Sequence, residues 1–110
     1  MSGSDLFTGT LDILILRTLS AEPAHGYAIG RAIREGSEGV LSVEEGALYP
    51  ALHRLQRKGL LEAEWGRTDT GRRAKFYRVT VDGMEHLERE SARWAEYSVA
   101  VTAILGTQGR

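Results

Sequence analysis

The 110-residue chain contains no cysteine, only two prolines and no long apolar run. Without cysteine, neither a disulfide framework nor a cysteine-ligated zinc site can form. The longest apolar run, Leu11 to Leu16, is interrupted by Asp12 and falls far short of the roughly 20 residues that a membrane-spanning helix needs. The N-terminus lacks the basic start of a secretory signal, and Asp5 precedes the short apolar run. We therefore expect a cytoplasmic protein with no membrane segment.

The chain also lacks recognisable catalytic or metal-binding patterns. Its three histidines, His25, His53 and His86, are scattered without metal-ligand spacing, and no nucleophile motif or phosphate loop is present. We interpret each histidine as a surface or capping residue. The sequence thus predicts a protein that is not an enzyme and that needs neither a cofactor nor a metal.

The charge is small in total but unevenly distributed. Size and composition, with 42% apolar and 26% charged residues, are those of one globular domain. The net charge of −1 argues against a nucleic-acid binder. However, residues 1–45 hold 3 basic and 7 acidic side chains (net −4), residues 46–78 hold 8 and 3 (net +5), and residues 79–110 hold 3 and 5 (net −2). Such segregation hints at a surface for a polyanion, although a basic stretch is often only a solvated face.

Apolar spacing predicts two helices in the first third of the chain. Residues 7–20 are apolar on more than one side of a helical turn, which indicates a mostly buried helix with Thr8 or Thr10 as its cap. A proline and a glycine within residues 21–26 interrupt the pattern. A second helix is expected over residues 26–36, with an inward face of Tyr27, Ile29 and Ile33.

A third helix is predicted from the spacing of Ser42 and Glu45, which is that of a capping box, to about Lys58. Pro50 cannot donate a hydrogen bond to the carbonyl of Gly46, so an irregular or bent first turn is expected. The predicted inward stripe is Leu48, Leu52 and Leu55.

The period then changes to that of strands. Residues 60–67 and 74–81 alternate, and the polar loop between them carries glycines and arginines, so a β-hairpin is predicted. On the first strand, Leu61, Ala63 and Trp65 are expected on one face and Glu62 and Glu64 on the other.

The C-terminal stretch shows a heptad repeat. Steps of 3 and 4 recur over three heptads, and the helix should reach roughly 33 Å at 1.5 Å per residue. A domain this small cannot cover the whole helix, so a second chain should cover the remainder. The predicted dimer interface consists of Leu87, Ser91, Trp94, Ser98, Val101 and Leu105.

Three helices, a β-hairpin and a long last helix form the order of a winged helix-turn-helix, an α+β and mainly α fold. Over about residues 9–90 the sequence resembles PadR-family transcriptional regulators, in the branch with a single C-terminal helix. The resemblance implies a DNA-binding domain over residues 1–81 and a dimerisation helix over residues 82–110. The matching stretches are "HGYAIGRAI", "EEGALYPALHRLQRKGLLEAEW", "GRRAKFYRVT" and "DGMEHL".

The resemblance implies a sequence-specific, dimeric regulator of transcription that binds a pseudo-palindromic operator in double-stranded DNA. Helix N-termini attract phosphate, and Gly46 would let backbone approach the groove. Alternatively, Gly46 and Pro50 serve only packing between helices, and Tyr49 is either a phosphate donor or a core aromatic with a wet edge. The predicted DNA contacts are Ser42, Gly46, Ala47, Tyr49, Pro50, His53, Arg54, Arg67, Arg72, Arg73 and Lys75.

Two further interpretations remain open from the sequence. Because some members of the family sense small aromatic compounds, Trp65, Trp94 and Tyr97 are candidates for an effector pocket at the dimer interface, and repression is the expected output. The rival interpretation is a winged helix that binds only proteins. The basic stretch and the third helix argue against it.

Overall fold

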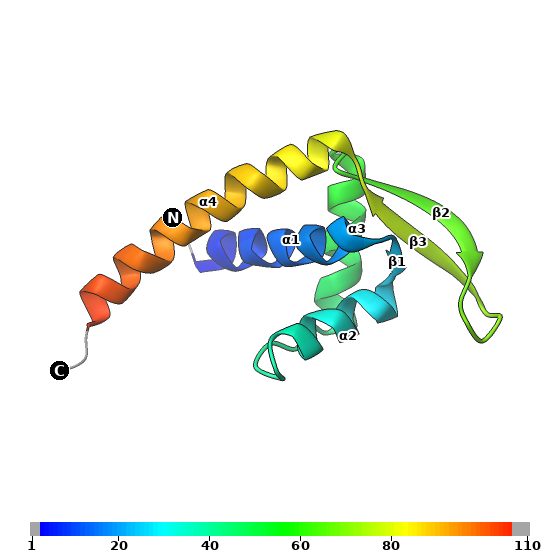
Figure 1. The fold of residues 1–110 in the computed structure, drawn as a ribbon, viewed down its shortest axis with the longest axis horizontal. Helices are drawn as coiled ribbons and strands as arrows, with labels where there is room; N and C mark the ends of the chain where they lie inside the picture. Colours follow the sequence, from blue (N-terminus) through cyan, green and yellow to red (C-terminus); the bar gives the residue numbers. More distant parts are fainter. Residues whose placement is uncertain (1–2, 107–110) are drawn as a thin grey trace.

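The fold is mainly helical with one small antiparallel sheet, as the predicted α+β winged-helix class requires. The computed structural model describes residues 3–106, with side chains from residue 9 onward. In Figure 1, α1 lies at the centre, α3 crosses it, the β2–β3 hairpin projects to one side, and α4 lies over α1 before continuing past it. The elements are α1 (Gly3–Ala21), β1 (Ala24–His25), α2 (Gly26–Gly36), α3 (Glu45–Arg57), β2 (Leu61–Arg67), β3 (Arg73–Val79) and α4 (Val81–Leu105).

Helix α1 is apolar on several sides because it contacts α2, α3, α4 and β3. It begins at Gly3, so Thr10 lies inside the helix and the predicted cap there is wrong; the side chain of Thr8 lies outside the described residues. Burial of this many aliphatic side chains stabilises the fold by roughly 1.5–3 kcal/mol each. The core comprises Leu11, Ile15, Leu16, Leu19, Ile29, Ile33, Leu48, Ala51, Leu52, Leu55, Leu60, Leu61, Tyr77 and Leu87.

A short strand that the sequence pattern does not reveal, β1, precedes α2. It pairs with β3 through Ala24 opposite Tyr77 and His25 opposite Phe76, which gives the sheet order β1-β3-β2. His25 also caps α2, because its Nδ1 accepts a hydrogen bond from the amide of Ala28 at 3.3 Å. Of the two roles expected for each histidine, surface or cap, His25 takes the capping one.

The inward face of α2 differs from the prediction at one residue. Ile29 and Ile33 are buried as expected, but Tyr27 is 65% exposed. The preceding residue, Gly26, is buried against Tyr49. A Cβ on Gly26 would lie 2.7 Å from ring atoms of Tyr49. The glycine therefore admits the Tyr49 ring, and the following tyrosine points outward.

Helix α3 begins without the predicted capping box. Glu44 is the N-cap residue and its side chain makes no capping bond; its carbonyl accepts from the amides of Ala47 and Leu48, both at 2.9 Å. The Ser42–Glu45 cap is therefore wrong. The helix continues through Pro50 to Arg57, so the proline does not interrupt it. As predicted, Leu48, Leu52 and Leu55 are buried.

Strands β2 and β3 pair from Leu61 opposite Val79 to Arg67 opposite Arg73. The predicted alternation is confirmed near the base of the hairpin, where Leu61 is buried and Glu62 is exposed. Beyond the core the same alternation continues without burial, so Trp65 is 59% exposed.

Helix α4 begins at Val81, where Thr80 Oγ1 accepts from the amide of Gly83 at 3.0 Å, and its first half packs on α1. Leu87 is 2% exposed inside the protomer's own core, so its predicted place in a dimer interface is wrong. The predicted domain boundary at residue 81 falls at the start of this helix, and residues 107–110 of the predicted arm lie outside the described residues. Within the described part, no helix is long and apolar enough to cross a membrane.

Arg54 does not point outward as predicted. Its Nη2 donates to Asp12 Oδ1 at 2.5 Å, joining α3 to α1 across the core. Asp12 is only 6% exposed. Burial raises the pKa of the Asp12 carboxyl above its usual value, while the positive charge of Arg54 opposes that rise. The Nη2 of Arg54 is therefore engaged within the protomer, and a DNA contact by the exposed part of this side chain stays a prediction.

Replacing Arg54 by methionine should lower the free energy of unfolding by about 3 kcal/mol near neutral pH, because Asp12 stays buried without its counter-charge. A carboxyl whose pKa is raised by folding destabilises the folded chain above its unfolded pKa, and this effect disappears as it takes up a proton. The loss should therefore shrink as the pH falls from about 7 toward about 4, the ordinary pKa of an aspartate, measured by urea denaturation.

The matched control is the double variant Asp12→Leu with Arg54→Met. It removes both charges and should keep most of the stability at both pH values, because no uncompensated charge is left in the core. An equal loss for Arg54→Met at the two pH values would contradict a charge effect.

Candidate nucleic-acid interface

The outward side of α3 carries one continuous stripe of exposed residues. Their spacing of three and four places them on a single helical face, opposite the buried leucines. Arg57 extends the stripe by one turn beyond the predicted contacts, and its spacing from His53 would have revealed it. The stripe consists of Gly46, Tyr49, Pro50, His53 and Arg57.

Gly46 is open to solvent at the second residue of α3. A Cβ built there meets nothing within 4 Å, so among the described residues no packing contact requires a glycine. The alternative that this residue serves packing between helices therefore has no support within the protomer. Two other predicted DNA contacts lie near Gly46 in the sequence: Ser42 is exposed and Ala47 is half-buried.

Tyr49 combines a packed ring face with a wet edge. The ring rests on the backbone of Gly26, and the side chain remains 37% exposed. The hydroxyl is among the atoms that lie against Gly26, so the ring joins α3 to α2, and a phosphate contact by Tyr49 stays a prediction. Tyr27, which the sequence pattern assigned to the core, lies exposed beside this contact.

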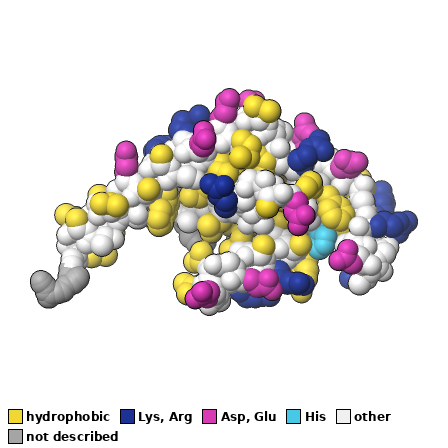
Figure 2. Space-filling model, in the orientation of Figure 1, with side chains coloured by type: hydrophobic (Ala, Val, Ile, Leu, Met, Phe, Trp, Pro, Cys, Tyr) yellow, Lys and Arg dark blue, Asp and Glu magenta, His cyan; other side chains and the backbone are white. Residues whose placement is uncertain are grey.

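The register of the hairpin places three of its basic side chains, Arg67, Arg73 and Lys75, on one face. Residues opposite each other in an antiparallel pair point to the same side, and so do residues two apart along a strand. Arg67 lies opposite Arg73 and Trp65 lies opposite Lys75, and this face continues the one that buries Tyr77. Figure 2 shows Lys and Arg side chains gathered at the end of the molecule where the hairpin projects.

The opposite face of the hairpin is acidic near its base. Glu62 and Glu64 are exposed there, and Glu62 forms an ion pair with Arg78 across the strands. The two faces of the hairpin therefore differ in charge.

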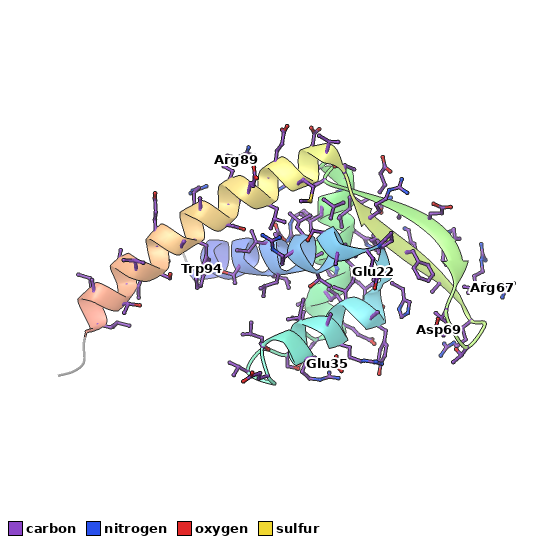
Figure 3. The ribbon with its side chains drawn as sticks, in the orientation of Figure 1. Glu22, Glu35, Arg67, Asp69, Arg89 and Trp94 are labelled. Atoms are coloured by element: carbon purple, nitrogen blue, oxygen red, sulfur yellow. The ribbon has the colours of Figure 1, made fainter. Side chains whose placement is uncertain are left out.

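The side chains at the hairpin tip are held to different degrees. Arg67 Nη1 donates to the carbonyl of Gly71 at 2.9 Å, and the Arg73 guanidinium carbon lies 4.4 Å from the centre of the Trp65 ring. The Arg72 side chain is exposed and makes no hydrogen bond or ion pair with the described residues. Figure 3 shows Arg67 at the outer end of the hairpin. Two arginines are thus pre-oriented and a third is free to reach a ligand.

The outer half of α4 carries exposed apolar side chains. Trp94 Nε1 donates to Thr10 Oγ1 at 3.2 Å, so the predicted seam meets the protomer's own α1 at this point. Ser91, Ser98 and Val101 are half-buried. Further along, the exposed fractions are 69% for Val99, 86% for Ile104 and 79% for Leu105.

The three candidate effector residues do not come together in the protomer. Trp65 lies on β2 in the hairpin, whereas Trp94 and Tyr97 lie on α4. Figure 3 shows Trp94 far from the hairpin. Trp65 lines a groove of about 820 Å³ along the hairpin, and Thr10 lines another of about 420 Å³ between α1 and the start of α3. Neither groove includes Trp94 or Tyr97, so Trp65 is separated from the other two.

Among residues 9–106, whose side chains the structure describes, no three His, Cys, Asp or Glu side chains gather as a bound ion would require. The arrangement offers an exposed helix face, a basic hairpin and an apolar arm, and these are elements for binding macromolecules.

Comparison with known proteins agrees with this arrangement. Residues 15–89 match the family described as transcriptional regulator PadR-like. An uncharacterised protein of Lysinibacillus sphaericus is 33% identical over 96 residues, covering 87% of this chain and 88% of that protein.

Solved structures of similar proteins share the whole fold. A transcriptional regulator from Clostridium thermocellum superposes with a TM-score of 0.83 at 25% identity, over 96% of this chain and 100% of that one. A regulator of the same family from Eggerthella lenta gives a TM-score of 0.76 at 34% identity, over 94% and 88%. The chain therefore belongs to the PadR-like family of transcriptional regulators.

Proposed function

We propose that this protein is a homodimer that binds a pseudo-palindromic operator in double-stranded DNA and represses transcription. The observation that carries the proposal is the pairing of the exposed α3 stripe with a one-sided basic hairpin. In this arrangement α3 enters the major groove and the hairpin grips the adjacent backbone. A two-fold dimer presents two such helices to half-sites about one helical turn apart, roughly 34 Å. Access to the chromosome implies action in the cytoplasm.

The start of α3 suits bases better than phosphates. Glu44 and Glu45 are exposed there and would repel a phosphate. A carboxylate can accept a hydrogen bond from the amino group of cytosine in the major groove. In this proposal Tyr49, Arg57 and the hairpin arginines bind the phosphates. The net charge of −1 does not prevent this, because the basic residues are concentrated in residues 46–78.

The apolar end of α4 supports dimerisation. Ile104 and Leu105 are almost fully exposed in the protomer, and exposed apolar surface of this kind marks an interface with another chain. The proposed interface consists of Ser91, Trp94, Ser98, Val101 and Leu105.

Repression is the proposed output of this binding. A reporter under the bound promoter distinguishes the outputs, since loss of the gene raises a repressed signal and lowers an activated one. Trp94 and Tyr97 are the proposed residues for an aromatic effector, and quenching of tryptophan fluorescence in a Trp65→Phe variant would detect it. A flat titration would remove the effector from the proposal.

Replacing Arg72 and Arg73 together by alanine should weaken binding to all DNA sequences alike, because both side chains are proposed to contact the backbone. The slope of log affinity against log salt should fall by roughly 0.9 for each phosphate that is no longer neutralised. Gel shifts on the upstream region of the gene at several salt concentrations measure both quantities. The charge-matched control is Arg89→Ala with Arg93→Ala on α4. An unchanged affinity and slope would remove the hairpin from the interface, and no salt-sensitive shift by the wild type would favour a protein-binding module.

Replacing Gly46 by alanine should leave the free energy of unfolding unchanged or raise it by up to about 1 kcal/mol, because alanine favours helix and the added methyl group meets nothing within 4 Å. Affinity for the operator should nevertheless fall about tenfold, about 1.4 kcal/mol, because the methyl group occupies the space of the approaching DNA. Gly36→Ala, at the far end of α2 and equally open, is the control. Full affinity in the Gly46 variant would mean that DNA does not approach this residue.

Replacing Val101 by aspartate should shift the protein from dimer to monomer at micromolar concentration, because a charge is placed in an apolar interface. Sedimentation velocity measures the change. Ala103→Asp adds the same charge on the opposite face of α4 and should leave the dimer intact. Dissociation in both variants, or in neither, would exclude the proposed face.

A further inference from the structure

Asp12 is the only charged residue that is buried among the described side chains. Its partner is the Arg54 guanidinium, whose Nη2 lies 2.5 Å from Asp12 Oδ1. The Nε of Arg54 is also buried and has no hydrogen-bond partner among the described residues. The ion pair is therefore direct but incompletely satisfied.

Stability does not explain this pair. Removing two charges from water costs several kcal/mol for each ion, and well-packed apolar residues of similar volume often serve as well or better. An unsatisfied Nε adds to that cost. The distinctive property of the pair is its direction, because a charge-assisted hydrogen bond fixes an orientation whereas apolar burial does not.

The pair lies where three helices meet. Lys58 near the end of α3 and His86 of α4 are the other charged or titratable groups that act on the Asp12 carboxyl. Thr10, two residues before Asp12 on α1, accepts the hydrogen bond from Trp94 of α4. The same short segment of α1 therefore holds α3 on one side and the arm on the other.

On α3, Arg54 lies directly after His53 and three residues before Arg57, both of which belong to the exposed stripe. Any rotation of α3 about its axis would move Arg54 away from Asp12 and turn the stripe by the same angle. An intact ion pair is therefore compatible with only one direction of the stripe relative to α1 and α4.

We propose that Asp12 and Arg54 are positioning residues that fix the orientation of α3 relative to the α1–α4 unit, and thereby set the separation of half-sites that the dimer accepts. This inference rests on the proposed function. Each recognition helix would lie roughly 17 Å from the two-fold axis, half of one helical turn of DNA. A change in the direction of α3 relative to the α1–α4 unit would change the separation of the two stripes, and one base pair corresponds to a rise of about 3.4 Å.

The test measures preference for operator spacing. Binding sites are first selected from random DNA with the wild-type protein, and the best site is then remade with the spacer between its half-sites shortened or lengthened by one base pair. The wild type should prefer one spacer by about tenfold or more. Asp12→Leu with Arg54→Met should remain dimeric but discriminate among the three spacers by less than about threefold.

Two further variants sharpen the comparison. Glu90→Gln with Arg93→Gln removes an ion pair that lies within α4 alone and should keep the wild-type ratio. Asp12→Asn preserves the size of the side chain and a hydrogen bond to Arg54, so it should give an intermediate ratio and serves if the apolar pair does not fold.

The outcomes separate the inference from the proposed function. A wild-type protein that selects no DNA overturns the proposed function and this inference with it. A wild-type preference that survives unchanged in the Asp12 and Arg54 variants overturns only the inference. A uniform loss of affinity with the same spacer ratio does so too, because it shows a structural role without a positioning one.

Discussion

The hydroxyl of Thr80 holds together the three elements whose angles define the candidate interface. It donates to the carbonyl of Gly59 at 2.7 Å and accepts from the amide of Gly83 at 3.0 Å, while its backbone amide donates to Leu60. The exit of α3, the end of β3 and the start of α4 therefore share one residue. Gly83 makes this possible, because a Cβ there would collide with the Leu60 carbonyl. Hairpin and arm are both fixed to α3 at this junction.

Charge of both signs contributes to the proposed orientation on DNA. The alternation of β2 and β3 sends Arg67, Arg73 and Lys75 to the core side of the hairpin. The glutamates lie on the other side, where Arg78 is paired with Glu62, so the positive charge is concentrated on the core side. At the start of α3 the exposed carboxylates of Glu44 and Glu45 oppose contact with a phosphate backbone. A chain with net negative charge can thus present a strongly positive edge.

Periodicity was sufficient to predict the helices, the hairpin and most of the core, because the spacing of apolar residues reflects which side of an element is buried. It failed where a contact depends on shape or direction. Arg54 has the charge and the donors of a phosphate ligand. Only the fold shows that Asp12 lies beside it and pairs with it in the core. Tyr27 fits an apolar stripe, but the Tyr49 ring occupies the space above Gly26. Leu87 fits the heptad seam, which does not distinguish a protomer's own α1 from another chain.

The two halves of α4 illustrate how one pattern serves two purposes. Up to Trp94 the seam is used within the protomer, and beyond it the helix extends past α1 with Ile104 and Leu105 exposed. The protomer contributes few packing contacts to this exposed segment, and isolated helices of this length are only marginally stable in water. Covering it with a second copy would stabilise the arm. Because α1 also holds α3 through Asp12, the same association would place two recognition helices at a fixed separation.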